Sequence, residues 1–205
     1  MARLAIEFDW NRDPKGYRLI ESKRRVVRNG KGHTPNDVVH YRPLSSVGSL
    51  FLIFANIATK PAGVLDFVQR FGPLTFHGWD AAQGDDVDLV MFHANHMRQI
   101  LKSWDGDKKR PHLPLGQPPS TSLDAQVIWD PAIKALKWEL RPKSLLDALW
   151  LQLAQALTSS IQVRHCEHCG IWFEAGRGTG RRADSKFCSD EHRIAFNSVK
   201  RSKEK

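Results

Sequence analysis

Cysteine is scarce in this sequence, with only three among 205 residues. An odd cysteine number excludes a fully paired disulfide framework, and the start "MARLAIEFDW" lacks the apolar region of a secretion signal. We therefore expect a cytoplasmic protein. Long apolar stretches are missing too: the longest, "LFLIFANIA" from Leu50 to Ala58, is too short to cross a bilayer, so we expect no membrane partner.

Catalytic patterns are also missing. The glycine-rich "GRGTGRR" lacks the spacing of a phosphate-binding P-loop, and no nucleophile–base arrangement stands out elsewhere. A nuclease of the HNH type needs a catalytic histidine and a second metal, yet every histidine near the C-terminal cysteines is a ligand candidate or lies within their turn. We expect no enzyme, and a nuclease is the less favoured alternative.

Positive charge is abundant and unevenly placed. The net charge is +9, and residues 22–42 carry six Lys or Arg against one Asp. Residues 177–205 carry nine Lys or Arg against four acids. Clustered positive charge favours a polyanionic partner, because phosphate neutralisation releases counterions. The alternative is a solubilising surface.

Periodicity predicts an α+β fold for residues 1–160. Hairpins are expected over residues 4–20 and 125–140, and helices over 59–72, 87–104 and from Ser144 onward. Four prolines predict an irregular loop over 105–122. Asp85, Asp86 and Asp88 are expected to be charges at the start of a helix. His93 and His96 are better explained as partly buried structural histidines than as metal ligands.

The remaining segment, 161–205, contains all three cysteines. Cys166 and Cys169 form a CxxC pair, but Cys169 precedes Gly170, so the CxxCH of haem attachment is missing. A thioredoxin-like couple needs a helix after the pair, whereas "GIWF" is β-prone. Downstream, "FCSDEHR" adds Cys188 and His192 at i and i+4. The resulting Cys3His set predicts one structural zinc ion with no open coordination position.

Helical spacing supports His192 as the fourth ligand. Ser189 suits an N-cap, and Phe196 and Val199 follow His192 at i+4 and i+7, so we expect all three on one inward face. His165 and His168 are rival ligands. Both lie inside or against the CxxC turn, where reaching the same ion would strain the chain.

The same segment resembles a treble-clef-type zinc finger and is similar to the C-terminal fingers of the bacterial CGNR zinc-finger group. The matching residues are Cys166, Cys169, Phe173, the pair Arg181-Arg182 and "FCS" at 187–189. The Cys-Gly-Asn-Arg signature itself is absent, and His192 replaces a last cysteine. The resemblance covers about the last 40 residues and implies a DNA-binding regulator with a structural zinc.

Nucleic acid, DNA more than RNA, is therefore the expected partner. The residues expected to contact it are the basic ones around the predicted zinc: Arg177, Arg181, Arg182, Lys186, Arg193, Lys200 and Arg201. The alternative is a protein-interaction or purely structural finger, in which Trp172 and Phe173 are core or interface anchors.

Overall fold

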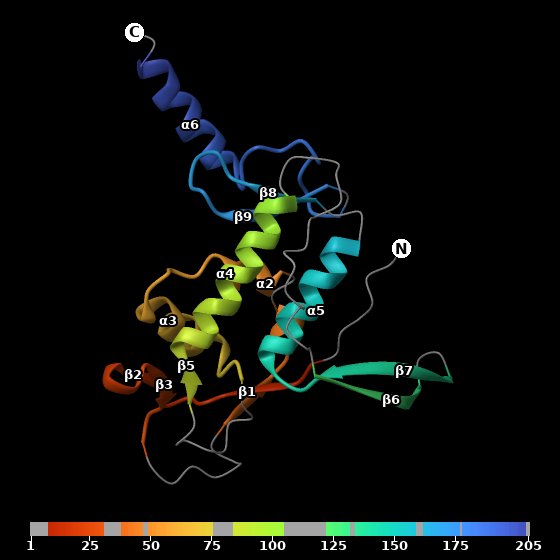
Figure 1. The fold of residues 1–205 in the computed structure, drawn as a ribbon. Coiled ribbons are helices and arrows are strands. Elements are labelled where there is room, and N and C mark those ends of the chain that lie inside the picture. Colours follow the sequence, from red (N-terminus) through yellow and green to blue (C-terminus); the bar gives the residue numbers. More distant parts are fainter. Residues whose placement is uncertain are drawn as a thin grey trace.

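The computed structural model describes residues 8–30, 38–46, 49–75, 84–104, 122–131, 134–158, 162–176 and 178–203. Their fold is α+β, as the sequence predicts, with four small antiparallel sheets and helices between them (Figure 1). The strands are β1 Trp10–Arg12, β2 Tyr17–Ile20, β3 Arg25–Arg28, β4 Val39–Tyr41, β5 Asp85–Asp86, β6 Leu123–Asp130, β7 Ala135–Pro142, β8 Gln162–His165 and β9 Trp172–Ala175. The helices are α1 Pro43–Ser46, α2 Leu50–Ala55, α3 Pro61–Phe71, α4 Val87–Trp104, α5 Leu145–Thr158 and α6 Asp190–Lys203, with a 3-10 turn at Glu21–Lys23.

The first predicted hairpin is wrong in its pairing. β1 pairs with β4, and β2 pairs with β3, so the two segments around "NRDPKG" do not pair with each other. The turn chemistry is present, because Gly16 adopts φ 74° and its N–H donates to the carbonyl of Asp13. The chain leaves that turn into a different sheet. Of the strand predicted at 4–10, residues 4–7 lie outside the described residues, and of residues 8–10 Trp10 lies in β1.

The second predicted hairpin and the three predicted helices are confirmed. β6 and β7 pair over their full length, and α3, α4 and α5 occupy the expected positions. Proline begins α3 at Pro61, and Gly72 ends it with φ 78°. Ser144 caps α5, since its hydroxyl accepts from the Asp147 N–H at 3.1 Å. The loop predicted over 105–122 lies outside the described residues, apart from Ser122.

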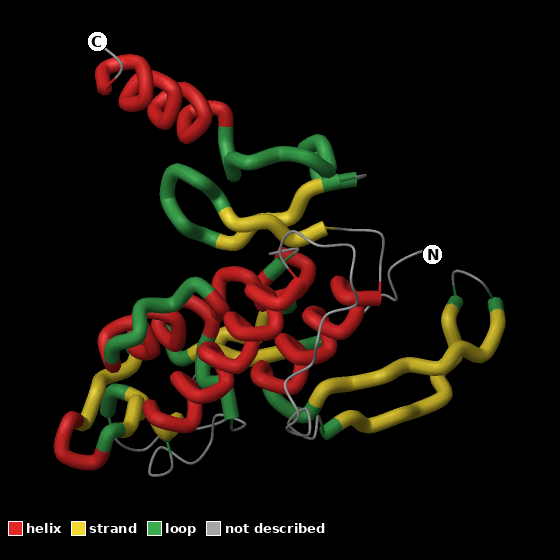
Figure 2. Tube along the Cα trace, turned by 45° about the horizontal axis from the view of Figure 1, so that its top comes forward, coloured by secondary structure: helices red, strands yellow, loops and turns green. Residues whose placement is uncertain are grey.

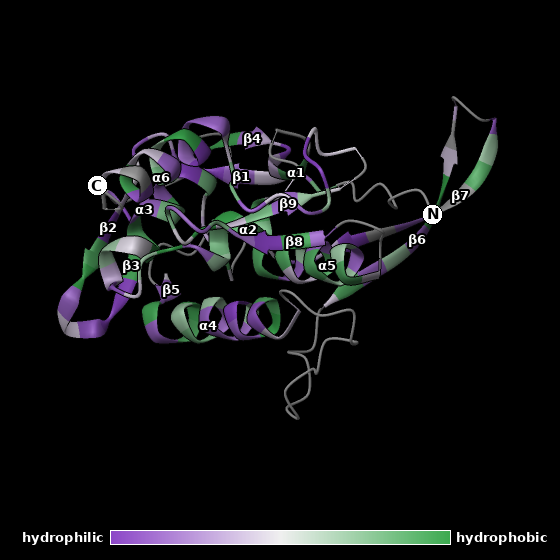
Figure 3. Cartoon of the chain, turned by 90° about the horizontal axis from the view of Figure 1, so that it is seen from above, coloured by the Kyte–Doolittle hydropathy of each residue, from purple (hydrophilic) through white to green (hydrophobic). Residues whose placement is uncertain are grey.

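The apolar run that opens at Leu50 forms the centre of the core. It folds as α2, which packs against both α4 and α5. Leu50, Phe51 and Phe54 are fully buried there. Hydrophobic and hydrophilic residues alternate along the outer helix α4 (Figure 3), as expected for a helix with one face on this core. None of the described helices is long and apolar enough to cross a membrane.

The β6–β7 hairpin extends away from the helices (Figures 1 and 2). Trp129 and Leu136 are paired across the two strands, and Val127 lies on the same face two residues along. All three side chains are exposed. The hairpin is therefore anchored mainly at its base, where β7 contacts α5.

The three aspartates at and just before the start of α4 have separate roles. Asp86 caps the helix, because its carboxylate accepts from the N–H groups of Asp88 and Leu89. Asp88 forms a bidentate ion pair with Arg24. Asp86 and Asp88 therefore confirm the prediction of negative charges at the start of this helix. Asp85 instead is fully buried in β5 and accepts from the N–H groups of Leu74 and Thr75, and burial raises its pKa.

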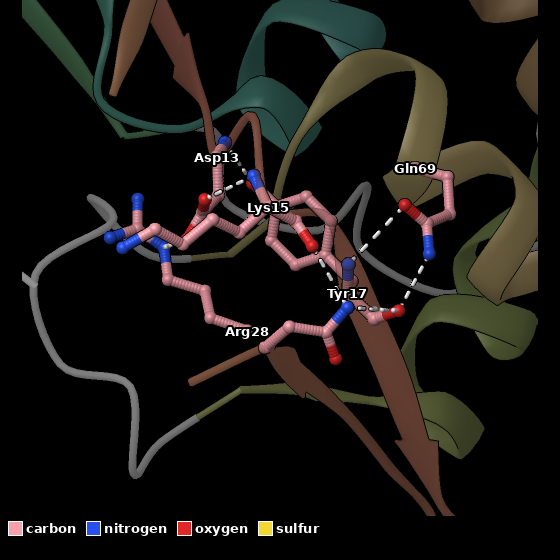
Figure 4. Close-up of polar contacts among 6 residues, drawn as sticks. Asp13, Lys15, Tyr17, Arg28 and Gln69 are labelled. Atoms are coloured by element: carbon pink, nitrogen blue, oxygen red, sulfur yellow. Dashed lines mark hydrogen bonds and ion pairs between the residues drawn. The ribbon is translucent and has the colours of Figure 1, made fainter. Parts of the chain in front are cut away.

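Part of the basic stretch 22–42 is not available to a partner. Arg28 is only 1% exposed and forms a buried ion pair with Asp13, whose oxygen lies 3.7 Å from its Nε (Figure 4). Tyr17 accepts from the Asp13 N–H, and Gln69 of α3 binds both the N–H and the carbonyl of Tyr17 (Figure 4). Arg28, one of the described residues of this stretch, therefore belongs to the interior of the fold and is not part of a basic surface.

The C-terminal segment lies against the rest of the molecule. We call residues 162–203 the finger and the described residues before 159 the body. Trp172 and Val163 of the finger belong to the core of the body. The Asn56 side chain accepts from the Trp172 N–H at 3.2 Å and donates to the Trp172 carbonyl at 3.4 Å. β9 is thus held on the end of α2. The predicted domain boundary at 160 lies outside the described residues.

Candidate metal centre

The four predicted ligands come from two elements. Cys166 and Cys169 lie in the turn that joins β8 to β9, so the CxxC pair itself closes this hairpin. Cys188 lies two residues before the start of α6, and His192 lies in the first turn of α6. The treble-clef arrangement that this segment resembles has a β-hairpin after the CxxC pair. There, only a single bridge between Gly176 and Arg181 continues the pairing among the described residues.

The four ligand atoms converge. They lie within 4.8 Å of one another. The sulfurs of Cys169 and Cys188 are 3.7 Å apart, and Nδ1 of His192 lies 3.9 Å from the Cys166 sulfur and 2.9 Å from the Cys188 sulfur. Zinc–sulfur and zinc–nitrogen bonds of about 2.3 and 2.0 Å give a tetrahedron with edges of roughly 3.5–3.8 Å. The cluster can therefore hold one metal ion, and the fitting ion is a structural zinc.

The electrostatics of the sulfurs also favour a cation. Burial opposes ionisation of the Cys166 thiol, but backbone N–H groups of Cys169, Cys188 and His168 outweigh it and lower its pKa to about 6. Burial and the neighbouring sulfurs raise the pKa of the Cys188 thiol to about 12. The first thiolate thus forms readily and hinders the next one. A divalent ion removes this conflict, because it stabilises all three thiolates together.

Backbone hydrogen bonds help to position the ligand residues. Gly170 adopts φ 74°, a conformation that suits glycine, and its N–H donates to the Cys166 carbonyl. The Cys166 N–H donates to the carbonyl of Ile171, and the Cys188 N–H points at the Cys166 sulfur at 3.5 Å. At α6, the Ser189 hydroxyl accepts from the His192 N–H at 3.3 Å, as expected for an N-cap.

Arg181 supports the cluster from outside. Its Nε donates to the Cys188 carbonyl at 2.9 Å, and its guanidinium lies over the Phe173 ring, 5.8 Å from the ring centre. Groups that bind the ligand residues orient them and raise metal affinity. The sequence placed Arg181 among the phosphate-contacting residues and gave no sign of this second role.

The rival histidines take other positions. The ring of His165 packs against Trp172, and the ring of His168 lies beside that of His192. Both are exposed, and neither belongs to the metal-binding group found among the described residues. Phe196 packs on Phe187, as the helical spacing predicts. Val199 does not face inward: it is 51% exposed, because α6 extends beyond the rest of the finger (Figure 1).

His93 and His96 lie far from this cluster, on α4. Both rings pack edge-on against Trp150 of α5. His93 is buried, and burial lowers its pKa, which favours the neutral form. They are not part of a metal-binding group among the residues that the structure describes. Their observed contacts are those of structural histidines.

Basic side chains line a hollow next to the segment that carries Cys188 and His192. Arg181, Arg182, Lys186 and Arg193 line this hollow, which has a volume of about 730 Å³. It lies between the segment before Cys188 and the first turn of α6. Lys200 lies farther along α6 and is exposed. Arg177 lies outside the described residues, and for Arg201 only the place in α6 is described.

The acids on the finger leave these cations accessible. Arg182 pairs with Asp184, Lys186 with Glu167 and Arg193 with Asp190, at distances of 3.2–3.4 Å. Most of these side chains are more than half exposed. Exposed ion pairs contribute little to stability and exchange readily. The cations can therefore change partners at small energetic cost.

The aromatic residues of the hairpin serve the fold. Trp172 and Phe173 are both buried, Trp172 in the body's core and Phe173 beside Cys166 and Cys188. Neither can stack on a base without unfolding β9. Asn56, which fixes Trp172, was missed by the sequence argument. Its partner is 116 residues away, and no local pattern indicates such a contact.

No family model, no curated protein and no solved structure matches this chain. The likeness to the CGNR zinc-finger group thus rests on the matching residues alone.

Proposed function

We propose that the protein is a nucleic-acid-binding protein of the transcription-regulator kind, which contacts DNA more than RNA through a zinc-held basic finger. The observation that supports this proposal is the ring of four cations, Arg181, Arg182, Lys186 and Arg193, around one hollow beside the metal cluster. A zinc-held segment that presents accessible cations beside the start of a helix suits phosphate contacts. The resemblance to the bacterial CGNR group points the same way, and a reducing bacterial cytoplasm would keep the thiols available for zinc.

Binding over a salt series tests the proposal. Zinc-loaded full-length protein is titrated into labelled DNA, and the logarithm of affinity is plotted against the logarithm of salt concentration. Three to four phosphate contacts on a duplex predict a slope of about −0.9 for each contact. Absence of binding to DNA and RNA at low salt would overturn the proposal.

Charge reversal locates the contact. Arg182→Glu with Lys186→Glu should abolish binding and leave zinc in place, because neither side chain contacts a ligand. The matched control is Arg18→Glu with Lys23→Glu, two exposed cations on β2 and the 3-10 turn. The control changes the net charge equally. An equal loss of binding in both variants would show that only overall charge matters.

A protein-interaction module is the second candidate. It is favoured by exposed apolar side chains on the finger, Ile194 at 58% and Val199 at 51%. In that case Ile194→Ala and Val199→Ala together should prevent binding to a protein partner, and the salt dependence of DNA binding should be missing. That the chain is not an enzyme remains a prediction.

A further inference from the structure

The shape of the hollow restricts the kind of nucleic acid that fits it. Duplex DNA is recognised by parts of a protein that protrude into a groove. Here the cations line a concavity instead, formed by the segment 179–189 and the start of α6. Its volume is about 730 Å³, and it is widely open to solvent; ligand clefts in proteins have volumes of roughly 300–1,000 Å³. A concavity of this size receives a protruding group, such as a base turned out of a single strand.

The chemistry of the lining agrees with a base better than with phosphate alone. Asp190 and Glu191 share the hollow with the cations. Asp190 accepts from Arg193. The Glu191 carboxylate hydrogen-bonds to Ser189 and lies near His192, with further lone pairs left to accept from a ligand. A carboxylate repels phosphate, but it accepts hydrogen bonds from an exocyclic amine such as N4 of cytosine. Cations and an acceptor together suit a nucleotide, which carries both phosphate and amine.

One wall of the hollow offers an aromatic ring. Phe187 lines it and is only partly buried, and its ring is fixed against Phe196 with ring centres 5.2 Å apart. Stacking of a base on such a ring is a recurrent contact in proteins that bind single strands. Arg182, with 88% of its side chain exposed, can move to follow a phosphate at the rim.

We propose that the hollow binds single-stranded nucleic acid by receiving one unstacked base against Phe187, with its amine on Glu191 and the adjoining phosphates on Arg182, Lys186 and Arg193. The proposal rests on the nucleic-acid binding proposed above and specifies its strand state. It predicts a preference for bases that carry an exocyclic amine.

Fluorescence anisotropy with zinc-loaded full-length protein tests the strand state. One labelled 12-nucleotide DNA strand of mixed sequence is titrated alone and as a duplex with its complement, at the same salt. We expect the single strand to bind at least ten-fold more tightly. Equal or tighter duplex binding would overturn this inference and leave the proposed function standing. Absence of binding to either form, or binding of an acidic peptide only, would overturn both.

Homopolymers and two variants test the base contact. Oligo-dC should bind about ten-fold more tightly than oligo-dT. Glu191→Ala should remove this preference. Asp184→Ala, which removes the same charge from the finger outside the lining of the hollow, should keep it. Phe187→Leu should weaken both single strands with little effect on the duplex. A dC preference that survives Glu191→Ala would overturn the role of Glu191, and equal dC and dT affinity in the unmodified protein would overturn the base site.

Discussion

The body and the finger are held together by different forces. In the body, α2, α3, α4 and α5 share one hydrophobic core, with Leu50, Val64, Leu101 and Leu149 fully buried. In the described part of the finger, the separate cluster has four buried residues, Cys166, Phe173, Ala175 and Cys188, and two of these are metal ligands. Burial of apolar area can stabilise the body, whereas so small a cluster needs a further source of free energy.

This difference indicates which interactions each region can lose. Zinc supplies about 10–16 kcal/mol in small zinc-held domains, which is comparable to the net stability of a whole protein, about 5–15 kcal/mol. Packing against the body also stabilises the finger, because Val163 and Trp172 are buried in the body's core. The two hydrogen bonds at Asn56 connect the regions. The following predictions separate these contributions.

Removal of the metal should have the largest effect. Cys188→Ser, or chelation of the native protein, should lower zinc from about one ion per chain to near zero and unfold the finger. The body should keep its cooperative melting. Zinc content by mass spectrometry and residue-resolved NMR follow the two regions. His168→Ala, beside His192 but outside the ligand set, should retain the metal; zinc loss there in place of His192→Ala would reassign the fourth ligand.

A cavity in the body should have the next largest effect. Leu149→Ala removes a fully buried side chain of α5 and should reduce the free energy of unfolding by about 2–5 kcal/mol. Zinc content should stay at about one ion per chain. Leu89→Ala on the exposed face of α4 is the matched control and should change stability by less than about 0.5 kcal/mol. Equal denaturation midpoints for the two variants would contradict the assignment of the core.

The connection between the regions should be weaker still. Asn56→Ala removes both hydrogen bonds to the Trp172 backbone and should cost about 1–3 kcal/mol, because a part-buried N–H loses its partner. Amide exchange in β8 and β9 should accelerate, with zinc content unchanged. Asn197→Ala, at an exposed position on α6, provides the comparison. Unchanged exchange would mean that apolar packing alone joins the regions.

The smallest effect concerns the support of the ligands. Arg181→Ala removes the donor to the Cys188 carbonyl and should weaken zinc binding about ten-fold. Arg182→Ala removes the adjacent guanidinium, which pairs with Asp184 in solvent, and should leave zinc affinity unchanged. Competition with a chromophoric chelator measures both. Equal affinities would limit Arg181 to the surface role that the sequence suggested.

The sequence predicted those features that depend on neighbours along the chain. Capping rules predicted the helix starts at Pro61 and Ser144. Alternation of apolar and polar residues predicted the β6–β7 hairpin, and ligand spacing predicted the group from Cys166 to His192. The pairing of β1 with β4 is different, because many strands could satisfy its hydrogen bonds equally well. Arg28 is buried because it pairs with Asp13, and the observed strand pairing, which differs from the predicted hairpin, brings these two residues together. Such long-range choices follow from packing of the whole chain.

The projecting helix α6 has a mechanical consequence. Its first turn is fixed by His192 and the Ser189 cap, whereas positions 197–200 are all exposed. At 1.5 Å per residue, its 14 residues form a rod about 21 Å long. A tilt of about 10° at the base would move the far end by about 4 Å. A small rotation of α6 caused by a rearrangement of the four ligands would therefore produce a larger displacement at the C-terminal end of the helix.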